Sequence, residues 1–350
     1  LSADGAVRDH LAARDGRANG VDAIQEYADD AYRAIAEYVL DHEEPLPAGT
    51  AMRLTAADAR LMAAVNGGEP FDLLNLLPQQ YRGDVAAVEA ELDGIIGLEE
   101  VKTFVRDIAK NVQAQQRRKA QGLQAASVNM HMIFTGNPGT GKTTIARILS
   151  KYLKAIGALR GGQLVEVTRA DLVGRYVGHT APLTNQVIQS ALGGVLFIDE
   201  AYSLYRGRED SFGLEAIDTL VKGIEDHRDD LVVILAGYTR EMQQFLTANS
   251  GLASRFPNQI EFPDYTGEQL WQIAGSIAKG KGYALDAACE APLKDYFARR
   301  QAADAGKNGN GRMARNVVER AILNQSKRLV ADPDASLELL LPGDFDLDED

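Results

Sequence analysis

A short run of glycine, threonine and lysine in this sequence has the spacing of a phosphate-binding loop. Residues Gly136 to Thr143 read GNPGTGKT, and glycines at these positions let a backbone turn tightly and approach a phosphate group closely. The amides of such a loop and the N-terminus of the following helix form an anion site. Lys142 would place its charge on the β- and γ-phosphates, and the Thr143 hydroxyl would bind Mg²⁺. The pattern predicts binding of a nucleoside triphosphate with Mg²⁺.

An acidic pair after an apolar run adds the second half of this chemistry. Residues Val195 to Glu200 read VLFIDE. We expect Asp199, at the end of a buried strand, to hold Mg²⁺ directly or through water, and Glu200 to polarise the attacking water. Phosphoryl transfer requires positioning and charge neutralisation from the protein rather than covalent chemistry. Either motif alone would also fit an ordinary turn, whereas the two together predict hydrolysis of the nucleotide.

The elements around these motifs indicate a parallel sheet with crossover helices, because strand-like and helical patterns alternate. Helical segments separate short apolar runs that lie near residues 130–135, 164–168, 195–198, 231–236 and 259–262. We therefore expect an α/β nucleotide-binding domain over residues 93–263.

After Pro263 the pattern becomes wholly helical, and we assign residues 264–330 to a helical lid domain and 331–350 to an acidic tail. The first helix of the lid is expected to start at Thr266, because Gln269 stands three residues further on, as in a capping box. The helices expected after it cover residues 291–300 and 313–329.

The first part of the chain, residues 1–92, is expected to form a separate, all-α domain. Apolar residues at helical spacing from Val21 to Val39 predict one helix. A second helix is predicted over residues 55–65, where Thr55 and Asp58 resemble a capping box. No 34-residue period is visible, so a helical repeat array is not predicted.

Charge is distributed very unevenly along the chain. Residues 1–100 contain 20 acidic side chains, 7 arginines and no lysine, whereas residues 101–350 contain 30 of each sign, so the whole net charge of −13 lies in the N-terminal part. The simplest interpretation is a solvated face, and the alternative is a docking surface for a basic partner. Because phosphate repels such a surface, nucleic acid is not an expected partner.

Cysteine use and hydropathy indicate the compartment. The single cysteine, Cys289, cannot form an internal disulfide, and no Cys/His cluster suggests zinc. No apolar run has the length of a membrane span, and no signal peptide is recognisable. We therefore expect a cytoplasmic protein.

Six motifs in order along the chain resemble those of the AAA+ ATPases: GNPGTGKTT, LVGRYVGHT, GGVLFIDEAYSLY, LVVILAGY, GLASRF and GNGRMARN. The resemblance covers about residues 92–330 and is strongest to the branch of CbbX, CfxQ and the stage V sporulation protein K relatives. The EccA ATPases of ESX-type secretion carry a similar module. This resemblance implies an AAA+ P-loop sheet with a C-terminal helical lid, ATP and Mg²⁺ as cofactors, and a nucleotide-dependent homo-hexameric ring.

The resemblance also implies roles for individual residues in nucleotide binding. ATP would contact the phosphate loop and a segment beside the adenine base, through Asn137, Pro138, Gly139, Thr140, Gly141, Lys142, Thr143, Thr144, Ile95 and Ile96. Arg255 stands where the family places an arginine finger, which reaches into the neighbouring subunit's site, although alone it would fit a surface ion pair. Arg312 matches the lid arginine called sensor 2, and Arg315, one turn further on, could share that role.

The position called sensor 1 departs from the common family pattern. Many AAA+ proteins place Asn or Thr at the end of the fourth strand, where it orients water. This sequence has Tyr238 at that position and Thr239 next to it. Both side chains can donate a hydrogen bond, so we assign Tyr238 and keep Thr239 as the alternative.

Two loops could contact other molecules. Tyr176, Val177 and Gly178 have the aromatic–aliphatic–glycine form of an AAA+ pore loop, whose exposed aromatic ring can grip a polypeptide with little sequence preference. This predicts a protein substrate, although Tyr176 alone would also fit a core position. The polar run from Arg206 to Ser211 is interpreted as a solvent loop, with a second pore loop or a contact for an anionic effector as alternatives.

We therefore predict an ATP-driven ring that remodels a protein target by pulling it through a pore. One alternative is a secretion or assembly chaperone that docks cargo through its acidic N-terminal residues, and another is a rubisco-activase-like enzyme. A nucleic-acid motor is disfavoured by the acidic balance. The identity of the target, the need for an effector and the state of the ring without nucleotide are not encoded in recognisable motifs.

Overall fold

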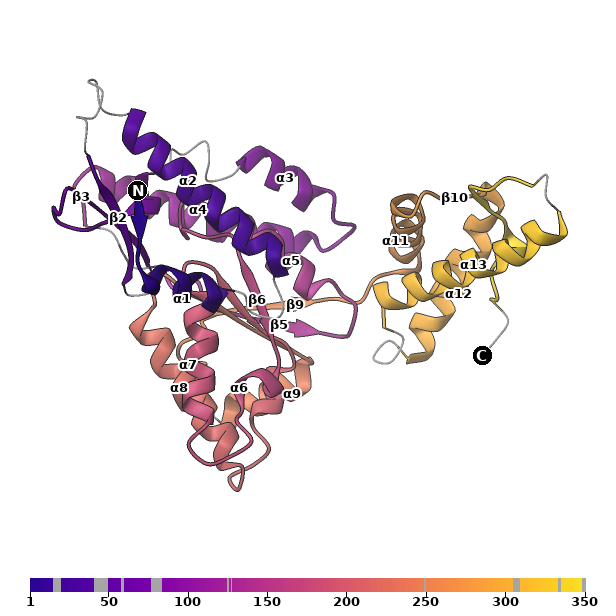
Figure 1. Cartoon of the computed structure of the whole chain (residues 1–350). Coiled ribbons are helices and arrows are strands. Elements are labelled where there is room, and N and C mark those ends of the chain that lie inside the picture. The colour runs from indigo at the N-terminus through magenta and orange to yellow at the C-terminus, as the bar shows by residue number, and fades with distance from the viewer. Residues whose placement is uncertain are drawn as a thin grey trace. The chain divides into compact units, whose positions relative to one another are not determined.

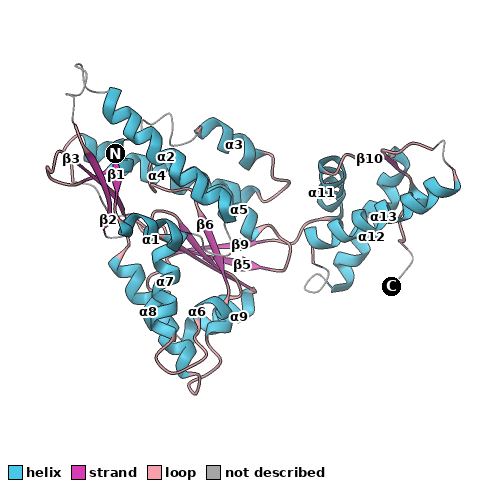
Figure 2. Ribbon diagram, viewed as in Figure 1, coloured by secondary structure: helices cyan, strands magenta, loops and turns pink. Residues whose placement is uncertain are grey.

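The computed structural model describes residues 1–14, 20–40, 50–57, 60–76, 84–124, 126, 128–248, 250–304, 309–332 and 335–347. Figures 1 and 2 show the chain, which divides into two compact units that are described separately below. The first unit comprises Leu1–Leu92, Thr103–Ile133 and Thr143–Gln259, and the second comprises Asp93–Lys102, Phe134–Lys142 and Ile260–Asp350.

A sheet with five strands among the described residues carries the candidate catalytic motifs. Its strand order is β6-β7-β8-β5-β9, and the β6–β7 and β7–β8 pairs are parallel. Every residue of β7 is buried, as expected where helices cover both faces of a parallel sheet. The predicted α/β fold and its strands are thereby confirmed as β5 (Met132–Gly136), β6 (Leu164–Val167), β7 (Val195–Ile198), β8 (Val232–Gly237) and β9 (Asn258–Phe262).

Helices of the first unit bury apolar stripes in its core. On α5 (Lys142–Ala155), the helix after the phosphate loop, Ile145, Ile148, Leu149 and Leu153 are buried at helical spacing. The remaining helices of this part are α4 (Glu99–Ala120), α6 (Arg169–Leu172), α7 (Thr180–Ala191), α8 (Ser211–Asp226), α9 (Thr239–Ala248) and α10 (Ser250–Ala253), with the 3-10 turn η3 (Ala201–Leu204).

The N-terminal part is not all-α, so that prediction is wrong. Thr55 does not begin a helix; it pairs with Met62 in an antiparallel hairpin. Met52, Leu54, Leu61 and Ala63 are buried, an alternation of period two that marks strands rather than a helix. The expected capping partner Asp58 lies outside the described residues. The strands are β1 (Ser2–Ala3), β2 (Met52–Ala57), β3 (Arg60–Val65) and β4 (Phe71–Asp72), in the order β1-β2-β3-β4.

Helices accompany this small sheet, and one of them was predicted. The helix expected from Val21 to Val39 is present as α2, but Tyr27, Ala31 and Ala34 form its buried side while Tyr32 and Val39 are exposed. The apolar face is therefore rotated from the one that the sequence suggested. The other elements are α1 (Gly5–Arg14), α2 (Gly20–Leu40), the 3-10 turn η1 (Leu73–Leu76) and α3 (Val85–Asp93).

Part of the acidic surplus pairs with cations of the same unit. The Asp30–Lys154 ion pair joins α2 to α5 at 3.1 Å, with side chains only 6% and 12% exposed. A buried ion pair is costly to break because one charge is left without a partner. Other ion pairs between residues 1–92 and the rest of the unit are Asp72–Arg160, Glu89–Arg106 and Glu91–Lys151. These carboxylates are therefore not all available to a basic partner.

The second unit contains the helical lid. Its first helix, α11 (Gly267–Gly280), starts with the predicted capping box, in which the Thr266 hydroxyl accepts from Gln269 N at 3.2 Å and the Gln269 side chain accepts from Thr266 N. The predicted helices after it are confirmed as α12 (Glu290–Asp304) and α13 (Gly311–Ala331). Two short strands, β10 (Ala284–Leu285) and β11 (Leu339–Leu340), pair in parallel, and the turns η4 (Ala287–Cys289) and η5 (Pro342–Asp344) complete the unit. Within the described ranges, no helix is long and apolar enough to cross a membrane.

Candidate active site

The phosphate loop joins β5 to α5, and its glycines adopt conformations that other residues avoid. Gly136, Gly139 and Gly141 have φ angles of +139°, +72° and +95°. A Cβ on Gly139 would lie 2.1 Å from the Gly309 carbonyl oxygen, and a Cβ on Gly136 would lie 2.5 Å from the Phe262 carbonyl oxygen. No side chain fits at either position, because the backbone of Phe262 or Gly309 already occupies the space.

The Lys142 ammonium lies over the start of this loop. Its Nζ donates to the carbonyl oxygens of Gly136 and Asn137, each at 2.8 Å. Thr143 and Thr144 follow in the first turn of α5. A cation and the amides of a helix N-terminus thus occur together, which is the combination that binds phosphate.

A buried asparagine of the lid holds the phosphate loop through its side chain. The Asn310 Nδ2 donates to the Pro138 carbonyl oxygen at 3.3 Å and to Asp264 Oδ1 at 2.7 Å. Its Oδ1 accepts from the Tyr265 amide at 2.9 Å and from Gln301 Nε2 at 2.8 Å. Asn310 has φ +46° and ψ −120°, a conformation that a residue with a Cβ adopts only when its surroundings impose it. One side chain therefore joins the loop to α12 and to the start of the lid.

The two residues after β9 extend this network. Asp264 accepts two hydrogen bonds from Asn137 Nδ2, at 3.0 and 2.9 Å. The Tyr265 hydroxyl donates to the Thr140 carbonyl oxygen at 3.2 Å, and burial raises the pKa of Tyr265 to about 12, so the phenol remains a donor at neutral pH. The sequence analysis missed Asp264, Tyr265 and Asn310. Their only sequence signals were an Asp-Tyr pair after the last strand and an Asn between two glycines.

In the second unit, the helix that carries the predicted lid arginines starts beside the loop. The Gly311 amide donates to the Gly139 carbonyl oxygen at 3.0 Å, which places the start of α13 beside Gly139. Arg312 and Arg315 lie in the first turns of α13 with exposed side chains, and within the described part of the chain their guanidinium groups have no hydrogen bond or ion pair. Both cations are therefore available to a ligand of the loop.

The segment predicted to contact the base belongs to the same unit. Ile95 and Ile96 are half-buried, and Leu98 follows them with a φ of +58°. A Cβ on Gly141 would lie 3.5 Å from a Leu98 methyl group. The predicted pair of isoleucines thus precedes a residue that packs against the phosphate loop.

The acidic pair follows β7 in the first unit. The Asp199 amide donates to the Val167 carbonyl oxygen at 2.8 Å, and Asp199 Oδ1 accepts from the Glu200 amide at 3.0 Å. Glu200 has φ +49° and ψ +43°, a left-handed conformation that a residue with a Cβ adopts only when its surroundings impose it. Such strain is concentrated at functional sites. The sequence predicted the pair but not this conformation.

Tyr202 lies close to the acidic pair and to Tyr238. The Tyr202 and Tyr238 ring centroids are 5.8 Å apart. Burial and the negative charge of Glu200 raise the pKa of Tyr202 above its usual range. Tyr238 is therefore in one cluster with Tyr202, while Thr239 begins α9. Tyr202 was not assigned a role from the sequence, although it lies within the GGVLFIDEAYSLY motif.

Arg255, the expected arginine finger, is engaged within its own chain. Its Nη2 lies 3.3 Å from Glu225 Oε2, and its Nη1 donates to the Gly251 carbonyl oxygen at 2.8 Å. The Arg255 Nε is buried and has no hydrogen bond. The Arg255 carbonyl oxygen accepts from Asn129 Nδ2 at 3.0 Å. The side chain would have to leave Glu225 before it could reach another subunit.

The Tyr176 loop, residues 174–179, projects its side chains into solvent. Tyr176 is 68% exposed and Val177 is 88% exposed, so a core position for Tyr176 is ruled out. The base of the loop is fixed, because the Gly174 amide donates to the buried Thr180 hydroxyl at 3.1 Å. The Tyr176 ring meets the His179 ring edge-on with centroids 5.6 Å apart. The loop therefore exposes an aromatic side chain at its tip and is fixed by a hydrogen bond at its base.

The polar run from Arg206 to Ser211 ends in an anchored carboxylate. The Asp210 carboxylate accepts two hydrogen bonds from the Arg169 guanidinium, at 2.7 and 3.0 Å, and one from the Gly213 amide. This Arg169 contact holds the pKa of Asp210 below its ordinary value. Arg206 and Arg208 are exposed. The end of the run therefore caps α8, and the three interpretations of the run are left as predictions.

Comparisons with known proteins agree with this geometry. Residues 132–264 match the model of the ATPase family associated with various cellular activities (AAA), and residues 266–350 match the AAA lid domain. Stage V sporulation protein K of Bacillus subtilis (strain 168) is 47% identical over 249 residues, covering 71% of this chain and 77% of that protein. The chloroplastic ribulose bisphosphate carboxylase/oxygenase activase of Cyanidioschyzon merolae is 44% identical over 266 residues, 75% of this chain and 90% of that protein. The crystal structure of the FIGL-1 AAA domain in complex with ADP is similar in fold, with a TM-score of 0.50, 19% identity and coverage of 72% of this chain and 80% of that chain.

The phosphate loop, the acidic strand end and the lid thus belong to an AAA family ATPase, and the chain is a member of that family. Within the family it belongs to the branch that contains stage V sporulation protein K, the CbbX and CfxQ proteins and this rubisco activase. The predicted resemblance and the predicted ATPase activity are confirmed.

Proposed function

We propose that the chain is a Mg²⁺-dependent ATPase that assembles into a homo-hexameric ring and pulls a protein target through its pore. One observation carries this proposal beyond ATP hydrolysis. Tyr176 and Val177 are exposed at the tip of a loop whose base is fixed by buried threonines. A large aromatic side chain that is held out into solvent is suited to contacting another polypeptide.

The residues present fit ATP and Mg²⁺. The loop backbone has no side chain at Gly136, Gly139 and Gly141, where a phosphate must approach closely, and the Lys142 ammonium lies at its start. The Thr143 hydroxyl and the Asp199 carboxylate are hard oxygen donors, which Mg²⁺ prefers. When bound, ATP with Mg²⁺ supplies the phosphoryl group and the neutralising charge. Glu200 would accept a proton from the attacking water, and Arg312 would bind phosphate oxygen.

The lid network offers a route from the nucleotide to movement. Asn310 bonds to the loop at Pro138 and to Asp264, while Tyr265 bonds to the loop at Thr140. A change in the loop would therefore alter hydrogen bonds at the base of α11, α12 and α13. We expect this network to transmit the state of the nucleotide to the lid, which moves against the core during turnover.

A second candidate function is cargo docking through the N-terminal residues, as in an assembly chaperone. The exposed positions of Tyr32 and Val39, seven residues apart on α2, favour it, because helical residues at this spacing share a face. Asp30 and Asp72 form ion pairs with Lys154 and Arg160 of the same unit, which counts against a purely acidic docking surface. A rubisco-activase-like function is suggested by one relative that carries that name.

The first test uses a variant that binds ATP without hydrolysing it. We expect Glu200→Gln protein to form hexamers with ATP and to retain one protein from its native lysate, but not with ADP. The capture should be lost in the Glu200→Gln, Tyr176→Ala double variant. Tyr32→Ala is the matched control, because Tyr32 is 74% exposed and Tyr176 is 68% exposed. Mass photometry reports assembly, and mass spectrometry identifies the retained protein.

The pair of tyrosines separates the two candidate functions. ATP-dependent capture that Tyr176→Ala removes and Tyr32→Ala preserves would support pulling through a pore. Capture that persists in ADP and is removed by Tyr32→Ala would favour cargo docking on α2. A monomer in ATP, with turnover independent of protein concentration, would contradict the ring.

Arg255 provides an independent test of the ring. In this proposal the guanidinium leaves Glu225 and reaches the neighbouring subunit's nucleotide. Arg255→Ala should therefore lower turnover by roughly a thousandfold while ATP affinity stays nearly constant. An equal loss in Arg228→Ala, which changes an exposed arginine elsewhere in the unit, would point to a general charge effect instead.

A further inference from the structure

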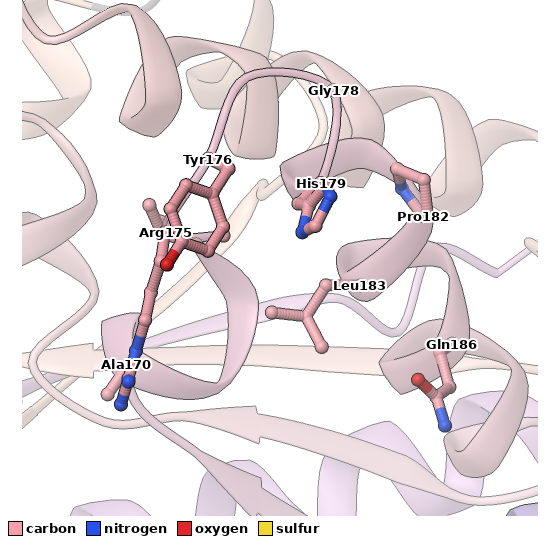
Figure 3. Close-up of a pocket in the computed structure, with 10 residues that line it drawn as sticks. Ala170, Arg175, Tyr176, Gly178, His179, Pro182, Leu183 and Gln186 are labelled. Carbon is pink, nitrogen blue, oxygen red and sulfur yellow. The ribbon is translucent and has the colours of Figure 1, made fainter.

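A pocket of about 520 Å³ lies beside the Tyr176 loop, within the first unit. Figure 3 shows Arg175 and Tyr176 on one side of this space and His179, Pro182 and Gln186 on the other, with Leu183 between them. His179, Leu183 and Gln186 follow one another at four and three residues, so they line one face at the start of α7. Ala170 of α6 and Val173, which follows α6, also line the pocket.

The pocket is lined by basic side chains and by no acidic ones. Arg175 and His179 are its ionisable basic side chains, and no carboxylate is among its lining residues. Within the described part of the chain, the Arg175 guanidinium has no hydrogen bond or ion pair. This is a local excess of donors on a chain whose net charge is −13. A ligand of the pocket should therefore carry an anionic or strongly accepting group.

Apart from Gln186, the other side chains of the lining are apolar. Val173, Pro182 and Leu183 surround the space together with the Tyr176 ring. These groups suit a short hydrocarbon stem, while the guanidinium of Arg175 suits a carboxylate at its end, because its planar fork can donate two parallel hydrogen bonds. The side chains of glutamate and aspartate combine these two properties.

Buried hydrogen bonds fix the base of the pocket. The Thr184 hydroxyl donates to the Leu172 carbonyl oxygen at 2.8 Å, and both Thr180 and Thr184 are fully buried. A Cβ on Gly174 would lie 2.7 Å from the His179 Cβ, so the two ends of the loop are in close contact. A binding site that is already shaped loses less entropy when it is occupied.

We propose that this pocket binds acidic side chains of the polypeptide that the Tyr176 loop contacts. The proposal rests on the proposed function, in which that loop meets an extended chain. In an extended chain every second side chain points to the same face, so a glutamate could enter the pocket while its neighbours pass Tyr176 and Val177. The loop would then prefer acidic segments rather than grip all sequences equally.

The test compares two fluorescent peptides that differ at one position. Both are extended 12-residue sequences with an amidated C-terminus; the central residue is glutamate in one and glutamine in the other, and no other side chain is charged. Fluorescence anisotropy measures their binding to the Glu200→Gln protein with ATP. We expect the glutamate peptide to bind roughly tenfold more tightly. Arg175→Ala should abolish this preference, and Arg175→Lys should retain part of it because the charge remains but the fork is lost.

Controls locate the effect and separate it from the proposed function. Arg228→Ala should keep the full preference, because Arg228 is an exposed arginine outside the pocket. Tyr176→Ala should weaken both peptides by a similar factor. Equal, ATP-dependent binding of both peptides would overturn the acidic pocket and leave the pore intact. Binding of neither peptide in any nucleotide state would overturn the proposed function as well.

The remaining arms identify the source of the carboxylate. A glutamine peptide with a free C-terminus should bind no better than its amide. If only the free terminus confers tight binding, the pocket recognises chain ends and the proposal for side chains is wrong. Inorganic phosphate should compete only weakly, because it lacks the apolar stem; strong competition would show that the site is a simple anion site.

Discussion

Glycine has opposite roles in two loops of this chain. The phosphate loop and the Tyr176 loop both precede a helix, α5 and α7, and both contain glycines with positive φ. At Gly139 the space for a Cβ is filled by the Gly309 carbonyl, whereas around Gly178 nothing lies within 4 Å. In the first loop glycine admits a neighbouring backbone, and the backbone is the binding surface. In the second it permits a turn that exposes side chains.

The loops also differ in what holds them. The phosphate loop is fixed by groups far away in sequence, since Asn310 bonds to Pro138 and Tyr265 bonds to Thr140. The Tyr176 loop is fixed locally, because Thr180 accepts from Gly174 six residues earlier. Remote substitutions should therefore damage the first loop, while only neighbouring ones should damage the second.

Among substitutions in the two loops and their supports, the largest effect is expected from Gly139→Ala. The new Cβ would meet the Gly309 oxygen at 2.1 Å in a backbone with φ +72°, so the loop and the start of α13 cannot keep their positions. ATP turnover should fall by roughly a hundredfold or more. Gly122→Ala is the matched control, because Gly122 also has φ +72° but nothing within 4 Å; it should lose about 1 kcal/mol of stability and no turnover. Similar steady-state kinetics for the two variants would show that the close approach is unimportant.

A pH dependence is expected from the start of the strand that leads to the phosphate loop. His131 is 4% exposed, its Nδ1 accepts from the Val233 amide at 3.1 Å, and burial lowers its pKa from 6.5 to about 4. The unfolded chain therefore binds a proton at higher pH than the folded chain. The stability is fully present above pH 6.5 and is lost as the pH falls to 4, by about 3 kcal/mol in all.

Chemical denaturation at several pH values measures this loss, and a substitution isolates the histidine. In His131→Gln the side-chain carbonyl can still accept from Val233, but no proton binds between pH 4 and 6.5. The difference in unfolding free energy between wild type and variant should therefore change over this range. A constant difference would assign the acid sensitivity to other groups.

The sequence was sufficient for the first loop and its sheet because both depend on local pattern. Buried parallel strands such as β7 are continuous apolar runs, and the glycine spacing of the phosphate loop is required by its backbone. Asn310 and Asp264 were not predicted, since their importance comes from contacts across more than 40 positions of the chain. Such contacts leave no periodic signal.

In the N-terminal hairpin, by contrast, a local pattern was present and led to a wrong prediction. Thr55 and Asp58 have helix-capping types, and Leu61, Met62 and Val65 also fit a helical face, so local chemistry favoured a helix. The alternation of buried Met52 and Leu54 with exposed Arg53 shows a strand, but it covers too few residues to outweigh the capping pattern. Pairing with β3 decides the structure, and pairing is not visible from one strand.

A smaller effect, about 2 kcal/mol, is expected when the remote support of the phosphate loop is removed. Asn310→Ala deletes four hydrogen bonds of a fully buried side chain and places alanine at φ +46°. It should lower thermal stability and weaken binding of a fluorescent ATP analogue by roughly tenfold. Asn310→Gly relieves the backbone while still lacking the hydrogen bonds, so it separates the two contributions. Recovery of ATP affinity in the glycine variant would mean that conformation, not the network, supports the loop.

The smallest effect should follow from breaking the local support of the Tyr176 loop. Thr180→Val preserves the shape of the side chain but leaves the Gly174 amide without its acceptor, at an expected loss of about 1 kcal/mol that is confined to the loop. Hydrogen exchange should become faster at residues 174–179, and target remodelling should fall several-fold, because the aromatic tip loses its fixed base. Thr180→Ser restores the hydroxyl and should restore both measurements. If Thr180→Val instead weakens ATP binding as strongly as Asn310→Ala, the two loops are not held independently, and the contrast between remote and local support does not apply to this chain.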